Sequence, residues 1–65
     1  MSIIKLVCRD HIYLAIPREG LKKKKAQTLL RREAKELGLV PDVFNDACLL
    51  GNQGPTLYCL RAKAA

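Results

Sequence analysis

The chain has 65 residues, a formal net charge of +6 and a hydrophobic fraction of 49%. This length allows one domain over residues 1–65 with a thin core, which leaves little room for a buried catalytic cleft. The many Leu, Ile and Val residues exclude a chain that is disordered throughout, and the excess of Lys and Arg favours an anionic partner: nucleic acid, an acidic protein or an anionic membrane.

Two apolar runs near the N terminus predict β-strands. Residues 3–8 and 12–16 are rich in residues that favour strands, and the short polar segment 9–11 between them indicates a hairpin. We expect a three-residue connection, because a two-residue turn would mix the apolar faces of the two strands. The longer connection places six side chains on one face: Ile4, Leu6, Cys8, Ile12, Leu14 and Ile16. Pro17 lacks an N–H group and ends the second strand.

A long helix is predicted from Leu21 to Leu37, a segment without Gly or Pro. It follows a loop at Gly20. The apolar residues recur at helical spacing and form one face: Ala26, Leu29, Leu30, Ala34 and Leu37. Gly38 is expected to end the helix in the left-handed conformation.

The C-terminal third predicts a short second helix and a last strand. Asp42 or Pro41 can begin that helix, and Val43, Phe44, Ala47 and Leu50 fall on one helical face. Residues 51–55 form a loop, and residues 56–62 alternate as a strand. We therefore expect an α+β fold with a small three-stranded antiparallel sheet, one long basic helix and a short second helix, in the order ββααβ.

The long helix carries most of the positive charge of the chain. At helical spacing, Lys24, Thr28, Arg31 and Lys35 form one row opposite the apolar face, flanked by Lys25 and Arg32. A solvated helix face usually mixes Glu with Lys, whereas this row contains no acid. Lysines at the helix N terminus also oppose the macrodipole. A bound polyanion would relieve both penalties, so the row indicates a phosphate-binding face.

Residues 20–37 resemble the last helix of double-stranded-RNA-binding domains. In that family a glycine and a lysine pair open a helix that follows a sheet, and the lysines contact phosphates across the groove. Lys23-Lys24-Lys25-Ala26 followed by Leu29-Leu30 is similar to this opening. The resemblance covers about a quarter of the chain and implies duplex backbone contact by the helix.

Residues 34–47 resemble a helix-turn-helix of the lactose-repressor type. Small Ala34, turn-forming Gly38 and apolar Leu37, Leu39, Phe44 and Ala47 occupy the matching places. The second helix of such a unit would carry Asp42 and Asp46 without Lys or Arg, whereas base-reading helices usually present basic or amide side chains. We therefore assign nucleic-acid contact to the basic helix.

The cysteines and the histidine offer the one candidate metal site. Cys8, His11, Cys48 and Cys59 would suit tetrahedral zinc, but Cys48 and Cys59 lie in apolar segments typical of core cysteines. We expect no metal, no cofactor and no enzyme activity. Three cysteines argue against a secreted disulfide scaffold, and the N terminus shows no signal peptide, so we expect a cytoplasmic protein without a membrane span.

The few aromatic residues favour a duplex over a single strand, because single-strand binders usually stack bases on aromatic rings. We also expect a homodimer, because a sheet covered on one face leaves several apolar side chains without a place to bury. These are Ile3, Val7, Tyr13, Tyr58 and Leu60.

Our main hypothesis is a nucleic-acid-binding regulatory module that contacts duplex phosphates through the basic helix. The residues expected to bind are Arg18, Lys22, Lys23, Lys24, Lys25, Arg31, Arg32 and Lys35. The alternative is a small interaction or inhibitor protein that binds an acidic surface of a larger protein. A helix with a charged outer row serves either role.

Overall fold

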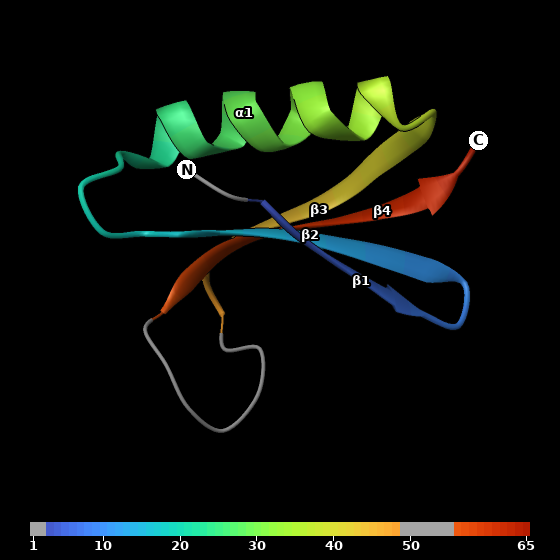
Figure 1. Ribbon diagram of the computed structural model, residues 1–65, viewed down its shortest axis with the longest axis horizontal. Helices are drawn as coiled ribbons and strands as arrows, with labels where there is room; N and C mark the ends of the chain where they lie inside the picture. The colour runs from blue at the N-terminus through green and yellow to red at the C-terminus, as the bar shows by residue number, and fades with distance from the viewer. Residues whose placement is uncertain (1–2, 49–55) are drawn as a thin grey trace.

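The computed structural model describes residues 3–48 and 56–65. Its elements are β1 (Ile4–Cys8), β2 (His11–Pro17), α1 (Lys23–Glu36), β3 (Leu39–Cys48) and β4 (Leu57–Ala64). The strands form one antiparallel sheet in the spatial order β1-β2-β4-β3, and α1 covers one face of this sheet (Figure 1). The expected three-stranded sheet with two helices is therefore wrong. The described residues form four strands and a single helix.

The second helix was predicted where β3 runs. The pairing of β3 with β4 shifts register between Pro41 and Val43 and again between Asn45 and Cys48. Each irregularity breaks the two-residue alternation that identifies a strand, so the apolar residues fall by chance at helical spacing. Because Pro41 has no N–H, it is tolerated at this edge of the sheet. A helix-turn-helix over residues 34–47 is excluded, because its second helix is this strand.

The hairpin between β1 and β2 exists, but its turn is shorter than expected. Cys8 pairs with His11, so the turn consists of Arg9 and Asp10 alone. Arg9 has a φ of 54°, in the left-handed region that residues other than Gly rarely adopt. This turn places Ile4 and Leu6 on the opposite face from Leu14, contrary to the expected shared face.

The core lies between α1 and the central strands β2 and β4. The largest fully buried side chains are Leu14, Ile16, Leu30 and Leu60. Ala26 and Ala34 are fully buried one turn before and one turn after Leu30, and their small side chains bring the helix backbone close to the sheet. The predicted apolar helix face is therefore confirmed at these three positions, whereas Leu37 is 43% exposed.

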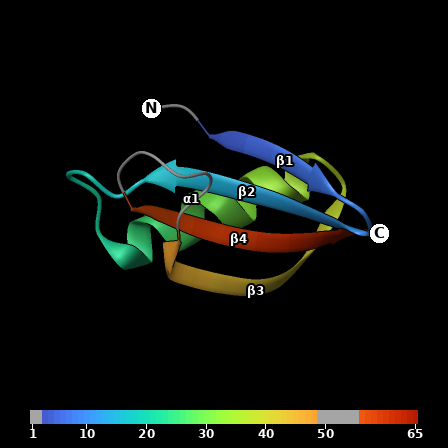
Figure 2. The same cartoon turned by 90° about the horizontal axis from the view of Figure 1, so that it is seen from below.

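The other face of the sheet has no helix over it among the described residues (Figure 2). Strand alternation and register place two rows on this open face. One row is Ile4, Ala15, Cys59 and Asn45, and the other is Leu6, Tyr13, Arg61 and Val43. Ala15 and Cys59 are buried, while the larger apolar side chains at the sheet margins stay about 40% exposed. Tyr58 and Leu60 are buried in the core, so they cannot supply the exposed surface expected for a homodimer.

Candidate nucleic-acid interface

The segment before α1 fixes where the helix begins. The Leu21 N–H donates to the Arg18 carbonyl at 2.9 Å, and Gly20 has a φ of 71°, so the chain turns tightly here. Lys22 then stands at the N-cap in an extended conformation, and no side chain caps the helix. The first turn contains no acidic residue. The positive end of the helix dipole is therefore left without an anionic side chain in its first turn.

Tyr58 in β4 holds this segment against the sheet. Its hydroxyl donates to the Leu21 carbonyl at 2.8 Å, and its ring stacks on Phe44 with centroids 6.0 Å apart. The Arg18 guanidinium lies over the same ring, 5.2 Å from its centroid. The alternation in residues 56–62 does not reveal which face of the strand meets the helix, so the role of Tyr58 was not predicted from the sequence. Tyr58 thus links the start of the helix to the central strand.

The buried stripe of α1 determines which of its side chains face outward. With Leu30 directed into the sheet, 3.6 residues per turn place Lys24, Arg31 and Lys35 on the outer side. All three are exposed. Thr28, the fourth member of the row, donates its hydroxyl to the Lys24 carbonyl at 3.0 Å, so it adds no charge. Lys24 to Lys35 spans about 16 Å along the helix axis.

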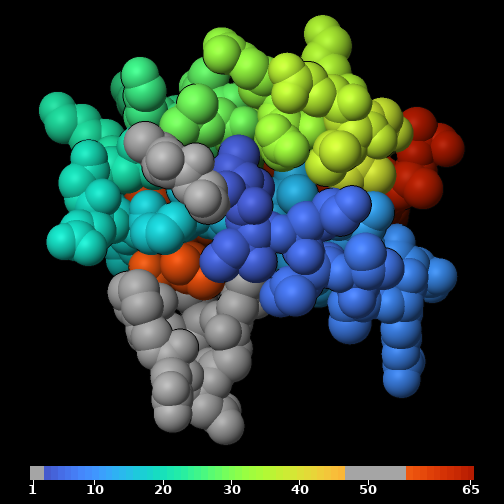
Figure 3. Space-filling model, viewed as in Figure 1, coloured from blue at the N-terminus to red at the C-terminus, as the bar shows by residue number. Residues whose placement is uncertain are grey.

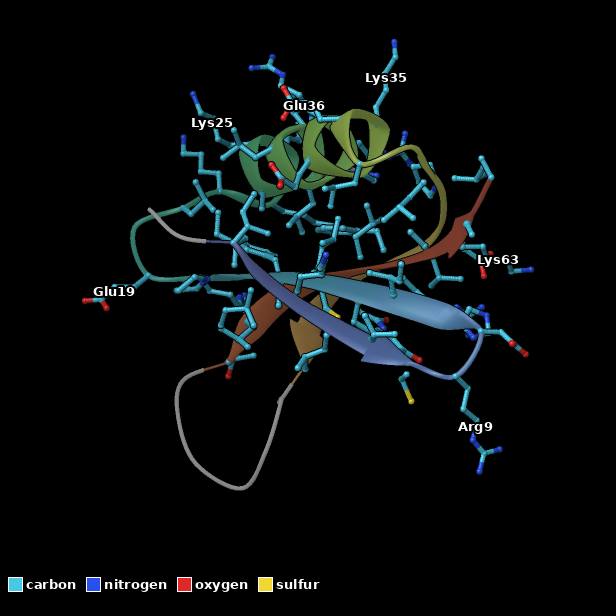
Figure 4. All side chains as sticks on the ribbon, turned by 45° about the vertical axis from the view of Figure 1, so that its right-hand side comes forward. Arg9, Glu19, Lys25, Lys35, Glu36 and Lys63 are labelled. Carbon is cyan, nitrogen blue, oxygen red and sulfur yellow. The ribbon has the colours of Figure 1, made fainter. Side chains whose placement is uncertain are left out.

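Figure 4 shows the same arrangement in the labelled side chains. Lys25 and Lys35 project from α1 away from the sheet, whereas Arg9 projects from the β1–β2 turn at a distant part of the surface. In the space-filling view, the side chains of α1, coloured green to yellow, form the side of the molecule above the sheet (Figure 3). The cations of α1 are therefore gathered on one side rather than spread over the molecule.

Two of the eight predicted contact residues have structural partners. Lys23 lies close to the inner side of the helix, and its Nζ is 3.5 Å from Asp46 Oδ2 in β3. Arg18 is engaged with the Tyr58 ring. The other six are exposed, and within residues 3–48 and 56–65 they form no ion pair: Lys22, Lys24, Lys25, Arg31, Arg32 and Lys35. We call these six residues the basic face.

The two acids of the helix lie away from the row of three cations. Glu33 and Glu36 fall on the opposite edge of α1, and Glu33 is half-buried. The nearest i,i+4 combination is Arg32 with Glu36, and no ion pair joins them. The row of Lys24, Arg31 and Lys35 therefore contains no acid, although Glu36 lies one turn from Arg32.

The aromatic rings do not provide a surface for stacking bases. Tyr58 is buried, and Tyr13 and Phe44 are half-buried. These three residues are all the aromatic residues of the chain. The surface available for a nucleic acid is therefore charged rather than aromatic, and it matches phosphates better than bases.

The remaining chemistry is sparse in the part of the chain that the structure describes. No three His, Cys, Asp or Glu side chains come together as in a metal site, and no pocket is found there. Cys8 and His11 face each other across the hairpin turn, and Cys59 lies buried in β4. α1, the single helix of the described residues, is not long and apolar enough to cross a membrane.

Comparison with protein families, with curated proteins and with solved structures finds no match to this chain. The functional interpretation therefore rests on the geometry and charge of the molecule itself.

Proposed function

We propose that this protein is a small regulatory module that binds the phosphate backbone of a nucleic-acid duplex through the outer side of α1. One observation carries the proposal: six exposed cations lie on the outer side of α1 or at its N-cap without an ion-pair partner in the described residues. A duplex presents about one negative charge per 1.7 Å of its axis, so a row of about 16 Å meets phosphates along its whole length.

Binding would remove two unfavourable interactions of the free protein. The lysines near the start of α1 repel one another and oppose the helix dipole, each at a cost of a few tenths of a kcal/mol. Phosphates bound over this turn would attract both the lysines and the positive end of the helix dipole, and binding would release counterions from the nucleic acid. We therefore expect affinity to depend strongly on salt.

The same surface offers little for reading bases. Its side chains are Lys and Arg, and the Thr28 hydroxyl already donates to the backbone. A convex helix held flat on a sheet by Ala26 and Leu30 is suited to contacts along a backbone. We expect binding with little sequence preference, stronger for duplexes than for single strands. A cytoplasmic site of action belongs to this proposal, and the odd number of cysteines supports it.

The experiment compares two charge-reversed variants of equal net charge. One carries Lys24→Glu, Arg31→Glu and Lys35→Glu on the basic face. The matched control carries Lys5→Glu, Arg9→Glu and Lys63→Glu, three exposed cations outside α1. Each reversal removes two charges, so both variants have a formal net charge of zero instead of +6. Any difference between them reports position rather than total charge.

We expect the helix variant to lose duplex affinity by about two to three orders of magnitude more than the control, measured by fluorescence anisotropy on labelled DNA and RNA. The wild-type log–log salt slope should be about −5 for six phosphate contacts, and about −3 in the helix variant. Equal affinities of the two variants would refute the proposal. A wild-type protein that binds neither duplex but binds an acidic polypeptide would instead support the interaction-protein alternative.

A further inference from the structure

β1 is an edge strand, and its outer side meets no other strand among residues 3–48 and 56–65 (Figure 2). All five of its residues are exposed. Three of them are large and apolar: Ile4 at 42%, Leu6 at 43% and Val7 at 70%. An edge with free backbone groups and apolar side chains is a template for pairing with another strand.

The register of the hairpin shows which backbone groups are available. Cys8 and His11 close a two-residue turn, and the residues that close such a turn form a hydrogen-bonded pair. Alternation then directs the N–H and C=O groups of Leu6 and Ile4 toward β2. The corresponding groups of Lys5 and Val7 point outward from the sheet.

The other edge strand has protection that β1 lacks. β3 contains Pro41, two register irregularities and the charged residues Asp42 and Asp46, all of which discourage pairing with a further strand. β1 has regular pairing along its length and Lys5 as its single charged residue. The sheet is therefore closed to addition at β3 and open at β1.

We propose that β1 pairs with β1 of a second copy of this chain, antiparallel and about a two-fold axis at Leu6. In this register Leu6 faces Leu6 of the second copy. Lys5 and Val7 of one copy face Val7 and Lys5 of the other and exchange both backbone hydrogen bonds. The outward-pointing groups of both strands are thereby satisfied.

Charge selects this register among the symmetric ones. A two-fold axis at Lys5 would oppose two lysines directly, and an axis at Val7 would oppose Lys5 to Arg9. The axis at Leu6 places no cation opposite another. It also joins Ile4 and Leu6 of the two copies into one continuous apolar stripe on the open face, which is why a second copy fits this edge better than an arbitrary peptide.

The basic helices do not oppose this assembly. A two-fold axis perpendicular to the sheet keeps both helices on the same side. Because α1 packs over β2, β4 and β3, the β1 strands separate the two helix axes by about 20 Å or more at 4.8 Å per strand. This separation exceeds the Debye length of ~8 Å at physiological ionic strength, so repulsion between the helices is largely screened.

The contact is small, because a five-residue edge buries less than the ~800 Å² per partner of a standard interface. We therefore expect a weak dimer, with a dissociation constant in the micromolar range or above. The proposal does not depend on nucleic-acid binding, and the variant with a charge-reversed helix should dimerise as the wild type does.

The test uses complementary charges at the axis. Leu6→Lys and Leu6→Glu each oppose like charges in the homodimer, so each variant alone should sediment as a monomer at concentrations where the wild type associates. An equimolar mixture should associate again, because Lys then faces Glu. Circular dichroism of each variant checks that the fold persists, as expected for a side chain that is 43% exposed.

Two further measurements keep the proposal testable if those variants unfold. Val7→Pro removes an outward N–H that the hairpin does not use, so it should abolish association and leave the fold intact. In the wild type, amide exchange at Val7 should slow as protein concentration rises, while exchange at Leu6 should not change. A wild type that stays monomeric to millimolar concentration, or a Leu6→Lys variant that associates as strongly, would overturn the proposal.

Discussion

The two faces of the sheet differ in what they contribute. On the side of α1, Leu14, Leu30 and Leu60 have at most 1% of their surface exposed. On the open face, Leu6 and Val43 keep about 40% of theirs exposed. Apolar burial drives folding, so most of the stability resides under the helix. Residues on the outer surface of the helix and on the open face can therefore serve binding with little loss of folding stability.

The largest expected effect is a core truncation compared with its equivalent on the open face. Leu30→Ala should lower the free energy of unfolding by about 3 kcal/mol, because it leaves a cavity between α1 and the sheet. Leu6→Ala should cost less than about 1 kcal/mol, since much of Leu6 is already in water. Urea denaturation followed by circular dichroism measures both. Equal losses would mean that the two faces contribute alike.

The two tyrosines allow the two faces of the sheet to be compared by removing one hydroxyl group from each. Tyr58→Phe should lower the free energy of unfolding by about 1 kcal/mol, because the Leu21 carbonyl loses its hydrogen bond. Tyr13→Phe on the open face removes a hydroxyl for which the described residues provide no hydrogen bond, so stability should stay within about 0.5 kcal/mol of wild type. Thermal unfolding of both variants provides the measurement.

The hairpin turn should respond in the stabilising direction. Arg9→Gly should raise the free energy of unfolding by about 0.5–1 kcal/mol, because Gly adopts a left-handed φ without steric penalty. Asp10→Gly is the control: Asp10 does not have a positive φ, so that change should be neutral or destabilising. A loss of stability in Arg9→Gly would argue against the two-residue turn.

The smallest effects on stability are expected from the two ion pairs. Here the pair that includes Arg61 of the open face should contribute more than the pair that includes Lys23 of α1. Asp46→Asn removes a pair with Lys23 that is largely exposed, so the change should be below about 0.5 kcal/mol. Asp42→Asn should cost slightly more, about 0.5 kcal/mol, because one carboxylate oxygen accepts from Arg61 at both 2.8 and 3.0 Å in a less exposed setting. Urea denaturation of each variant gives its loss of stability, and repeating the measurement at high salt shows how much of each loss is electrostatic.

The sequence was most informative about α1. The spacing of Ala26, Leu30 and Ala34 identified the buried stripe, and Gly38 ends the helix with a φ of 74° as predicted. These features are local: they depend on helical periodicity and on the conformational freedom of glycine. The composition of the exposed row follows from the same periodicity.

The errors arose where distant or irregular contacts decide the structure. Nothing in the local sequence shows that Arg9 adopts a left-handed φ. The resulting two-residue turn places Ile4 and Leu6 on the face of the sheet opposite to the one predicted. The bulges in β3 removed the alternation that would have identified a strand. The ion pair of Lys23 with Asp46 was not predicted, because Asp46 lies in a strand that the sequence did not reveal.

β4 lies inside the sheet although it comes last in chain order among the four described strands. It pairs with β2 on one side and β3 on the other, and it supplies Tyr58, Leu60 and Ala62 to the buried interior. A nascent chain that has emerged only as far as Cys48 therefore holds a hairpin, a helix and a separate segment with nothing to join them. Folding on the ribosome must wait until residues 57–64 leave the exit tunnel, so a stop codon before Leu57 should yield a product that proteases degrade.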